Sequence, residues 1–227
     1  MKHLVLHHNS SGDNMIKAII FDCFGVVYFD DFAALYDHFG GDSAKDAEYI
    51  EQFFFDVSKG KINWYEGIKQ RLGVTKEQWL EAREKYAGYN SELLSYISEL
   101  SKKYKIGMLT NIGPEGLEAF FDRTVIEPYF DVIVESGKLG YAKPEAQAYE
   151  AVAYSLGVRL EECVFTDDRQ PYIDGAIGVG MKAILFKDTA DFKKKLGGFL
   201  QRRGFSYDIV REVSHTLWEQ FQSESLE

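Results

Sequence analysis

The chain has 227 residues and a formal net charge of −10, with 45% hydrophobic and 27% charged residues. This length suffices for one large domain or for a core domain that carries an insertion. The negative charge argues against nucleic acid or an anionic membrane surface as the main partner. No apolar run approaches the roughly 18 residues of a transmembrane helix. An anionic substrate must therefore meet a local positive feature, either a metal ion or a suitably placed lysine.

The N-terminal residues 1–14 are polar and rich in Ser, Asn and His. The stretch is too polar for a secretory signal. We expect it to form a disordered leader. The two cysteines, Cys23 and Cys163, lie beside apolar strand patterns at opposite ends of their strands. We therefore predict two buried, reduced thiols that never pair, in a cytoplasmic protein.

Five short apolar runs are predicted to be strands: Lys17–Asp22, Lys105–Thr110, Asp131–Glu135, Cys163–Thr166 and Lys182–Phe186. They are continuous rather than alternating, which is typical of a parallel sheet covered on both faces. Helical patterns separate the later four strands, at Pro114–Phe121, Pro144–Leu156 and Pro171–Val179. This alternation predicts an α/β fold with a doubly wound parallel sheet.

Between the first two strands, from about residue 28 to residue 104, the apolar residues follow helical spacing throughout. Thr75 and Gln78 form a predicted capping box, and a last helix, Ser91–Tyr104, leads back to the sheet. We expect Trp64 and Tyr65 to belong to the core of this inserted bundle. The predicted organisation is a core of residues 15–27 and 105–200, a helical cap of residues 28–104, and a C-terminal helical extension of residues 201–227.

Several polar side chains stand where predicted strands end or helices begin. They are Asp22, Thr110, Asn111, Lys143, Asp167 and Asp168. This is the edge at which open α/β sheets bind ligands, so we predict that these residues form one site.

Asp167 and Asp168 are adjacent like charges that face a third acid, Asp22, and this arrangement is costly unless a cation sits among them. Oxygen ligands at a partly open site suit Mg²⁺, which bridges to phosphate oxygens. Asp22 would then attack phosphorus. Thr110 and Asn111 can donate hydrogen bonds to a phosphoryl oxygen, and Lys143 can hold an anion ahead of a helix.

Across roughly residues 15–200 the sequence resembles the haloacid dehalogenase-like hydrolase superfamily. "IIFDCFGVV" resembles its nucleophile motif, "MLTN" its second motif, "KPE" its lysine motif and "VFTDD" its acidic metal motif. The helical insertion resembles the cap of the subgroup that holds sugar-phosphate phosphatases and the phosphatase domain of epoxide hydrolases. The resemblance implies a Rossmann-like core, Mg²⁺ and a phospho-aspartyl intermediate on Asp22. It also implies metal ligation by Asp22, Asp168 and the main-chain carbonyl of Phe24, with Asp167 close by.

Phe24 departs from the motif, because most phosphatases of the superfamily have Asp at this point to protonate the leaving oxygen. Such help is worth about 10²–10⁴ in rate. Three functions fit the pattern: a phosphatase for small phosphorylated metabolites with good leaving groups, a non-catalytic binding protein, and a 2-haloacid dehalogenase. The pair Asp167 and Asp168 counts against the dehalogenase, and Tyr172 stands where many relatives have a polar residue. We expect the phosphatase; oligomeric state is left open.

Overall fold

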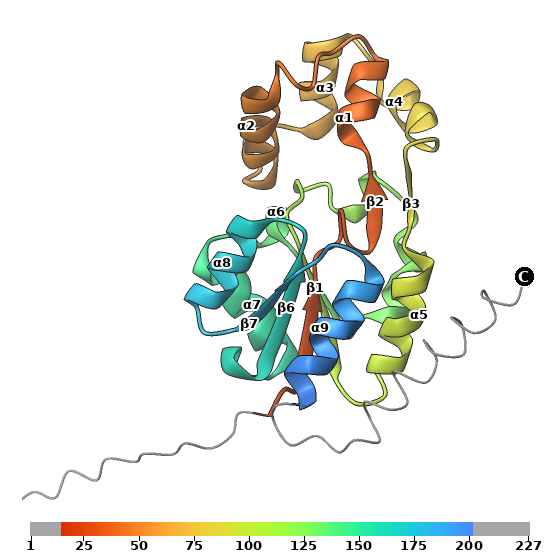
Figure 1. Cartoon of the computed structure of the whole chain (residues 1–227). Coiled ribbons are helices and arrows are strands. Elements are labelled where there is room, and N and C mark those ends of the chain that lie inside the picture. Colours follow the sequence, from red (N-terminus) through yellow and green to blue (C-terminus); the bar gives the residue numbers. More distant parts are fainter. Residues whose placement is uncertain (1–14, 202–227) are drawn as a thin grey trace, which may run out of the picture.

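The computed structural model describes residues 15–201. The leader at residues 1–14 and the predicted extension beyond residue 201 lie outside the described residues. A five-stranded sheet forms the centre of the core, in the order β5-β4-β1-β6-β7, and every neighbouring pair is parallel (Figure 1). Its strands are β1 (Ala18–Phe21), β4 (Lys105–Thr110), β5 (Val132–Glu135), β6 (Cys163–Asp167) and β7 (Lys182–Leu185).

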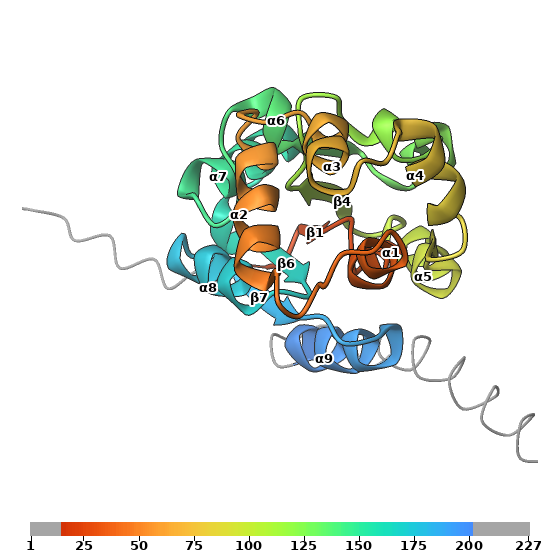
Figure 2. The same cartoon turned by 90° about the horizontal axis from the view of Figure 1, so that it is seen from above.

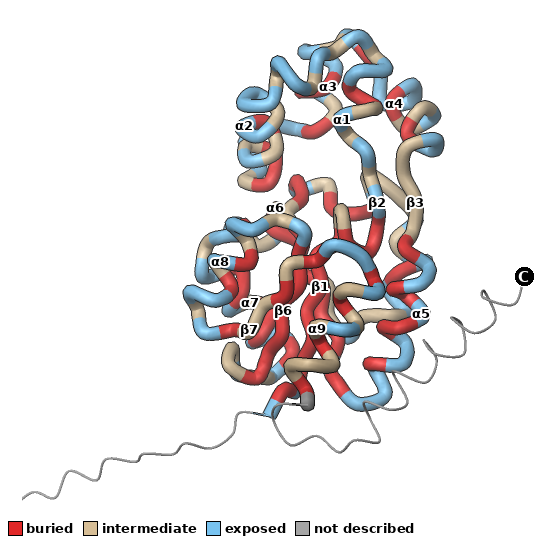
Figure 3. The backbone as a smooth tube through the Cα atoms, viewed as in Figure 1, coloured by how far each residue is buried: buried red, intermediate tan, exposed pale blue. Residues whose placement is uncertain are grey.

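Helices cover both faces of this sheet. One apolar cluster joins β1, β4 and β6 to α5 and α9, and a second joins the opposite face to α7 and α8. Figure 3 shows the strands buried between these layers. The helices of the core are α5 (Ser91–Leu100), α6 (Ser136–Leu139), α7 (Ala146–Leu156), α8 (Gln170–Gly178) and α9 (Thr189–Gln201). The predicted doubly wound parallel sheet is confirmed.

Four helices between β1 and α5 lie together beyond the C-terminal ends of the strands (Figure 1). We call this group the cap; it consists of α1 (Phe32–His38), α2 (Ala47–Ser58), α3 (Trp64–Leu72) and α4 (Lys76–Arg83). Trp64 is buried in the apolar cluster of these helices, as the sequence predicted. The predicted capping box of Thr75 and Gln78 begins α4. Seen from above, the cap helices surround the strand ends of β1, β4 and β6 (Figure 2).

The prediction that residues 28–104 are helical throughout is wrong at two places. Strands β2 (Tyr28–Asp30) and β3 (Ala87–Tyr89) form an antiparallel ribbon that carries the chain into the cap and out of it. Each strand has three residues, which is too short for an alternating pattern to stand out. The aromatic residues that suggested a helix here are also good strand formers.

The predicted helix Pro114–Phe121 is also wrong. After β4 the chain forms the 3₁₀ turns η1 (Leu117–Ala119), η2 (Arg123–Val125) and η3 (Glu127–Tyr129). Gly116 has a φ of +72°, a left-handed conformation that ends any helix begun at Pro114. A further 3₁₀ turn, η4 (Leu160–Glu162), precedes β6.

Both cysteines are buried and unpaired, as predicted. Cys163 begins β6 and pairs in register with Ala18, whereas Cys23 follows the other end of β1. Among residues 15–201, no helix is both long and apolar enough to cross a membrane.

Candidate active site

The site lies at the C-terminal ends of β1, β4 and β6, where the strand order reverses direction around β1. Asp22 follows β1, Thr110 ends β4, and Asp167 ends β6. Carboxylate oxygens of Asp22, Asp167 and Asp168 lie within 4.8 Å of one another. The parallel registers therefore bring together acids that are about 145 residues apart in the chain.

Lys143 is the counter-charge of this cluster. Its buried Nζ lies 2.7 Å from Asp22 Oδ1 and 2.6 Å from Asp167 Oδ2. Burial lowers the pKa of Lys143, but the two carboxylates outweigh burial and raise it above its usual range. The ammonium therefore stays charged. It lies 4.9 Å from the centre of the Tyr172 ring, which covers it from one side.

Asp22 has two different carboxylate oxygens. Oδ1 accepts hydrogen bonds from the Cys23 N–H at 2.7 Å and from Lys143, whereas Oδ2 receives no donor from the described residues. Burial, followed by the charge of Asp167, raises the pKa of Asp22 to about 8 against the opposing effect of Lys143. A further cation near Oδ2 would favour the ionised form, which is the nucleophilic one.

The two neighbouring acids after β6 differ in their surroundings. Asp167 is fully buried, and its two oxygens are bonded to Lys143 Nζ and to the N–H of Arg169. Asp168 is exposed as a residue, but its carboxyl lies against Gly25, and the partial loss of hydration there, followed by the charge of Asp167, raises its pKa. Asp167 thus orients Lys143, and Asp168 is the acid of the cluster that could offer an oxygen to a metal ion from the solvent side.

Gly25 allows the loop after Asp22 to approach Asp168. Its φ is +83°, and a Cβ placed on it would lie 2.3 Å from Asp168 Oδ2. The main-chain carbonyl of Phe24 accepts none of the backbone hydrogen bonds found among residues 15–201. Gly25 was not among the predicted site residues, although its place after an apolar strand and an acid was an available signal.

Thr110 and Asn111 have distinct partners. The Thr110 hydroxyl is fully buried and has no hydrogen-bond partner among the described residues, which is costly unless a ligand supplies an acceptor. Asn111 instead bonds to the backbone of Lys143, accepting from its N–H at 2.8 Å and donating to its carbonyl at 2.9 Å. The structure therefore ties the predicted Asn111 amide to Lys143.

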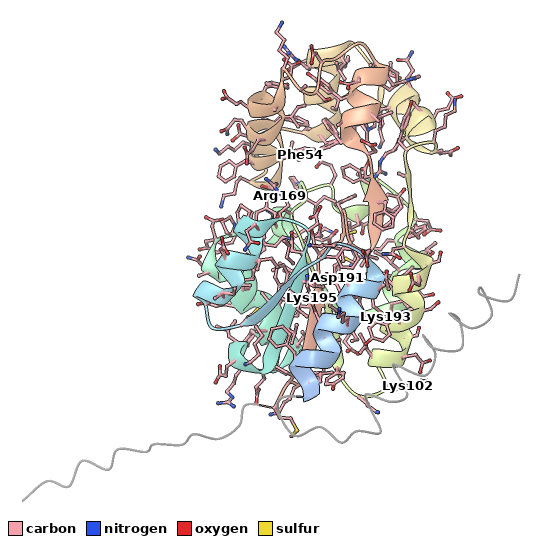
Figure 4. The ribbon with its side chains drawn as sticks, viewed as in Figure 1. Phe54, Lys102, Arg169, Asp191, Lys193 and Lys195 are labelled. Atoms are coloured by element: carbon pink, nitrogen blue, oxygen red, sulfur yellow. The ribbon has the colours of Figure 1, made fainter. Side chains whose placement is uncertain are left out.

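The cap contacts the core beside this site. Arg169 stacks on Tyr172 at 4.8 Å and donates to Glu51 of α2 across 3.3 Å. Lys59 at the end of α2 forms an ion pair with Glu145. Figure 4 labels Arg169 on the core and Phe54 on α2, on the two sides of this junction. Cap residues are therefore positioned to contact whatever enters the site.

A model of the haloacid dehalogenase-like hydrolase family matches residues 16–180. The chain belongs to this family. The match spans strands β1, β4, β5 and β6, the cap and every site residue, and it confirms the resemblance found in the motifs. A second model, for the third three-helix domain of RecX, matches residues 182–213. The described part of that stretch holds strand β7 followed by α9, so it lacks a three-helix fold.

Two curated relatives carry phosphatase names. GMP/IMP nucleotidase YrfG of Escherichia coli (strain K12) is 26% identical over 142 residues, which is 61% of this chain and 63% of that protein. Phosphatase MT3486 of Mycobacterium tuberculosis is 35% identical over 82 residues, 36% of this chain and 38% of that protein. The chain thus spans less than two thirds of the length of these relatives.

Solved structures of the family share the fold. The enzyme BT-2542 of Bacteroides thetaiotaomicron superposes with a TM-score of 0.65 at 24% identity, covering 80% of this chain and 98% of that one. A protein of Porphyromonas gingivalis, described as a predicted HAD-like family hydrolase, gives a TM-score of 0.66 at 20% identity, covering 82% of this chain and 98% of that one. These structures support the α/β core with its inserted helical cap.

Proposed function

We propose that this chain is a Mg²⁺-dependent phosphohydrolase that cleaves a small phosphate monoester through a phospho-aspartyl intermediate on Asp22. The observation that carries the proposal is the carboxylate cluster around one ammonium. When all three carboxyl groups are ionised, they exceed the one lysine by two negative charges. A divalent cation with oxygen ligands fits this deficit.

The residues that would hold Mg²⁺ are Asp22, Asp168 and the carbonyl of Phe24, with Asp167 supporting them through Lys143. The orphaned Thr110 hydroxyl beside them fits a phosphoryl oxygen. When bound, the metal neutralises negative charge on the transferring phosphoryl group. A structure of a BT-2542 variant holds magnesium and inorganic phosphate, and this supports the same ligand pair here.

The reaction would proceed in two steps at Asp22. A carboxylate oxygen of Asp22 forms a bond to phosphorus while the bond to the leaving oxygen breaks, and the electron pair leaves with that oxygen. Thr110 donates its hydroxyl to a phosphoryl oxygen, and Lys143 holds Asp22 and an adjacent phosphoryl oxygen. Water then attacks the phosphorus and the bond from phosphorus to the Asp22 oxygen breaks; the electron pair returns to the Asp22 carboxylate, and the proton of the water leaves with the phosphate.

Phe24 offers no proton to the leaving oxygen in the first step. The leaving group must therefore depart with little protonation, or the reaction is slower by about 10²–10⁴. This restricts the proposal to substrates with weakly basic leaving groups. The metal position is unaffected, because it needs only the backbone carbonyl of residue 24.

The test is phosphate release from a panel of phosphate esters, with and without Mg²⁺, alongside halide release from 2-haloacids. We expect Mg²⁺-dependent phosphate release that Asp22→Asn abolishes. Asp174→Asn is the matched control, since Asp174 is an exposed acid on α8 that bonds to Gln170. Metal-independent halide release would instead support a dehalogenase, and inactivity on both would support a non-catalytic binding protein.

A further inference from the structure

We infer that the substrates of this site are phosphate monoesters of aromatic hydroxyl groups, that is, aryl phosphates. This inference rests on the proposed phosphatase function and names the substrate class. It is carried by three observations: the ring at the position of the missing acid, the aromatic surface that continues from that ring into the cap, and the internal pairing of the Arg83 and Tyr65 polar groups beside it.

Phe24 joins an aromatic cluster two residues after the nucleophile. Its ring centre lies 5.5 Å from Phe120 and 6.3 Å from Phe121, and it meets Tyr28 edge-on at 6.2 Å. Phe24, Phe120 and Phe121 are only partly buried, so part of their aromatic surface remains accessible. The side of the site that usually offers a carboxyl group to the leaving oxygen offers aromatic carbon instead.

Phe120 extends this surface into the cap. Its ring meets Trp64 edge-on at 5.1 Å and stacks on Tyr65 at 6.5 Å, so it contacts both layers. Trp64 in turn lies 5.6 Å from Phe54, which Figure 4 labels on α2 next to the core. Aromatic rings from the core and the cap thus meet on one side of the site. Planar apolar groups pack well against such offset and edge-on rings.

Two polar groups within this aromatic region, those of Arg83 and Tyr65, are already paired with protein atoms, and the buried Trp64 N–H is a single donor without a partner among the described residues. The guanidinium of Arg83 is buried, donates twice to Asp30 and once to the carbonyl of Phe120, and lies 5.0 Å from the ring centre of Tyr28. The Tyr65 hydroxyl donates to the carbonyl of Ala119. A sugar would lose its water contacts here and find few replacement partners, whereas an aromatic ring needs none.

The leaving-group chemistry selects the same class. A phenol has a pKa of about 10, whereas water, and similarly an aliphatic alcohol, has about 15.7. When Asp22 attacks an aryl phosphate, the aryl oxygen departs as a phenolate with its electron pair and takes a proton from water afterwards. An alkoxide needs that proton during bond cleavage, and Phe24 cannot supply it. The lost acid and the aromatic surface therefore match one type of substrate.

Four substrates separate ring recognition from leaving-group basicity, each assayed with Mg²⁺ for kcat/KM. Phenyl phosphate has both features, acetyl phosphate has only the good leaving group, benzyl phosphate has only the ring, and glycerol 3-phosphate has neither. We expect phenyl phosphate to exceed benzyl phosphate by about 10²–10⁴. We expect the KM of phenyl phosphate to lie about 2- to 10-fold below that of acetyl phosphate, the gain of one aromatic contact.

A variant tests the surface itself. Phe120→Leu should raise KM about 2- to 10-fold for phenyl phosphate and leave KM for acetyl phosphate unchanged. Phe55→Leu is the matched control, because Phe55 is an exposed ring on α2 that faces Lys61 instead of the cluster. Acetyl phosphate hydrolysis by each variant also shows that the variant is folded.

The outcomes are distinct. A KM for acetyl phosphate equal to that for phenyl phosphate, or a kcat/KM for glycerol 3-phosphate equal to that for phenyl phosphate, would overturn the inference and keep the phosphatase. An equal rise in KM for both substrates in Phe120→Leu would also overturn it, since the ring would then shape the whole site. Inactivity on all four substrates would overturn the proposed function, and the inference would fall with it.

Discussion

Removing the ammonium of Lys143 should destabilise the protein in a way that Mg²⁺ reverses. The Lys143 side chain is fully buried between Asp22 and Asp167, with both Nζ–oxygen distances below 2.8 Å. Lys143→Met keeps the length and apolar contacts of the side chain but leaves buried carboxylates without their counter-charge. Breaking a buried ion pair in this way costs about 3–5 kcal/mol.

The lower end of that range is expected here. The pKa of Asp22 is already raised to about 8, so this carboxyl can take up a proton when the ammonium is lost. For a protein of this size, 1 kcal/mol corresponds to roughly 2–4 °C in Tm, so a cost of about 3 kcal/mol lowers Tm by about 6–12 °C. Mg²⁺ should recover part of this loss, because it binds among the same carboxylates.

Thermal unfolding followed by circular dichroism at pH 7.5, with and without Mg²⁺, measures both effects. Lys102→Met is the matched control, because Lys102 is exposed and its pair with Glu99 is worth about 0–1 kcal/mol (Figure 4). Adding Asp167→Asn to Lys143→Met should restore part of the stability, since one unpaired charge is removed. If Lys143→Met melted within 2 °C of the control without Mg²⁺, Lys143 would not be the counter-charge of the cluster.

Four further outcomes are expected. Phe24→Asp should raise turnover of alkyl phosphates by up to about 10² while changing aryl phosphates little, and an equal change on both would show that proton donation is not what residue 24 lacks. Asp168→Ala should abolish Mg²⁺ binding in calorimetry with the fold intact; unchanged affinity would refute the metal assignment. Cys23 and Cys163 lie about 15 Å apart along their strands, so mass spectrometry should find no cross-link between them. The pKa of Glu162 is lowered to about 2 by hydrogen bonds from the Lys17 side chain and from the backbone and side chain of Arg159. The contribution of Glu162 to stability is therefore present above pH 4.5 and is lost as the pH falls towards 2. The difference in Tm between wild type and Glu162→Gln should shrink over that window, and a constant difference would contradict it.

The sheet and the acids of the site were predictable because both depend on local sequence. An apolar run followed by Asp22 fixes a strand and its end, and in a parallel sheet all such ends meet at one edge. The partner of Asn111 was not predictable in this way. Its amide bonds to the backbone of Lys143, 32 residues further along, and only the fold brings them together.

The errors also have local causes. Pro114 suggested a helix start, but the left-handed conformation of Gly116 two residues later prevents the helix from continuing. Strands β2 and β3 are neighbours in the fold, but the four cap helices lie between them along the chain. The sequence of either strand alone therefore does not reveal its pairing. The buried pair of Arg83 and Asp30 is likewise formed between residues 53 positions apart.

From the sequence alone, Phe24 was only the loss of an acid. In the structure, the Phe24 ring has packing partners of its own. A lone ring substituted for an acid would leave apolar surface beside three carboxylates. Phe24 instead packs with Phe120 and Phe121, while the nearby charge of Arg83 is paired with Asp30. Restoring the acid by Phe24→Asp would therefore set a carboxyl group among rings that cannot solvate it. The surrounding rings limit how well the new carboxyl group can donate a proton. We therefore expect the turnover of alkyl phosphates to rise by well less than the full contribution of a general acid.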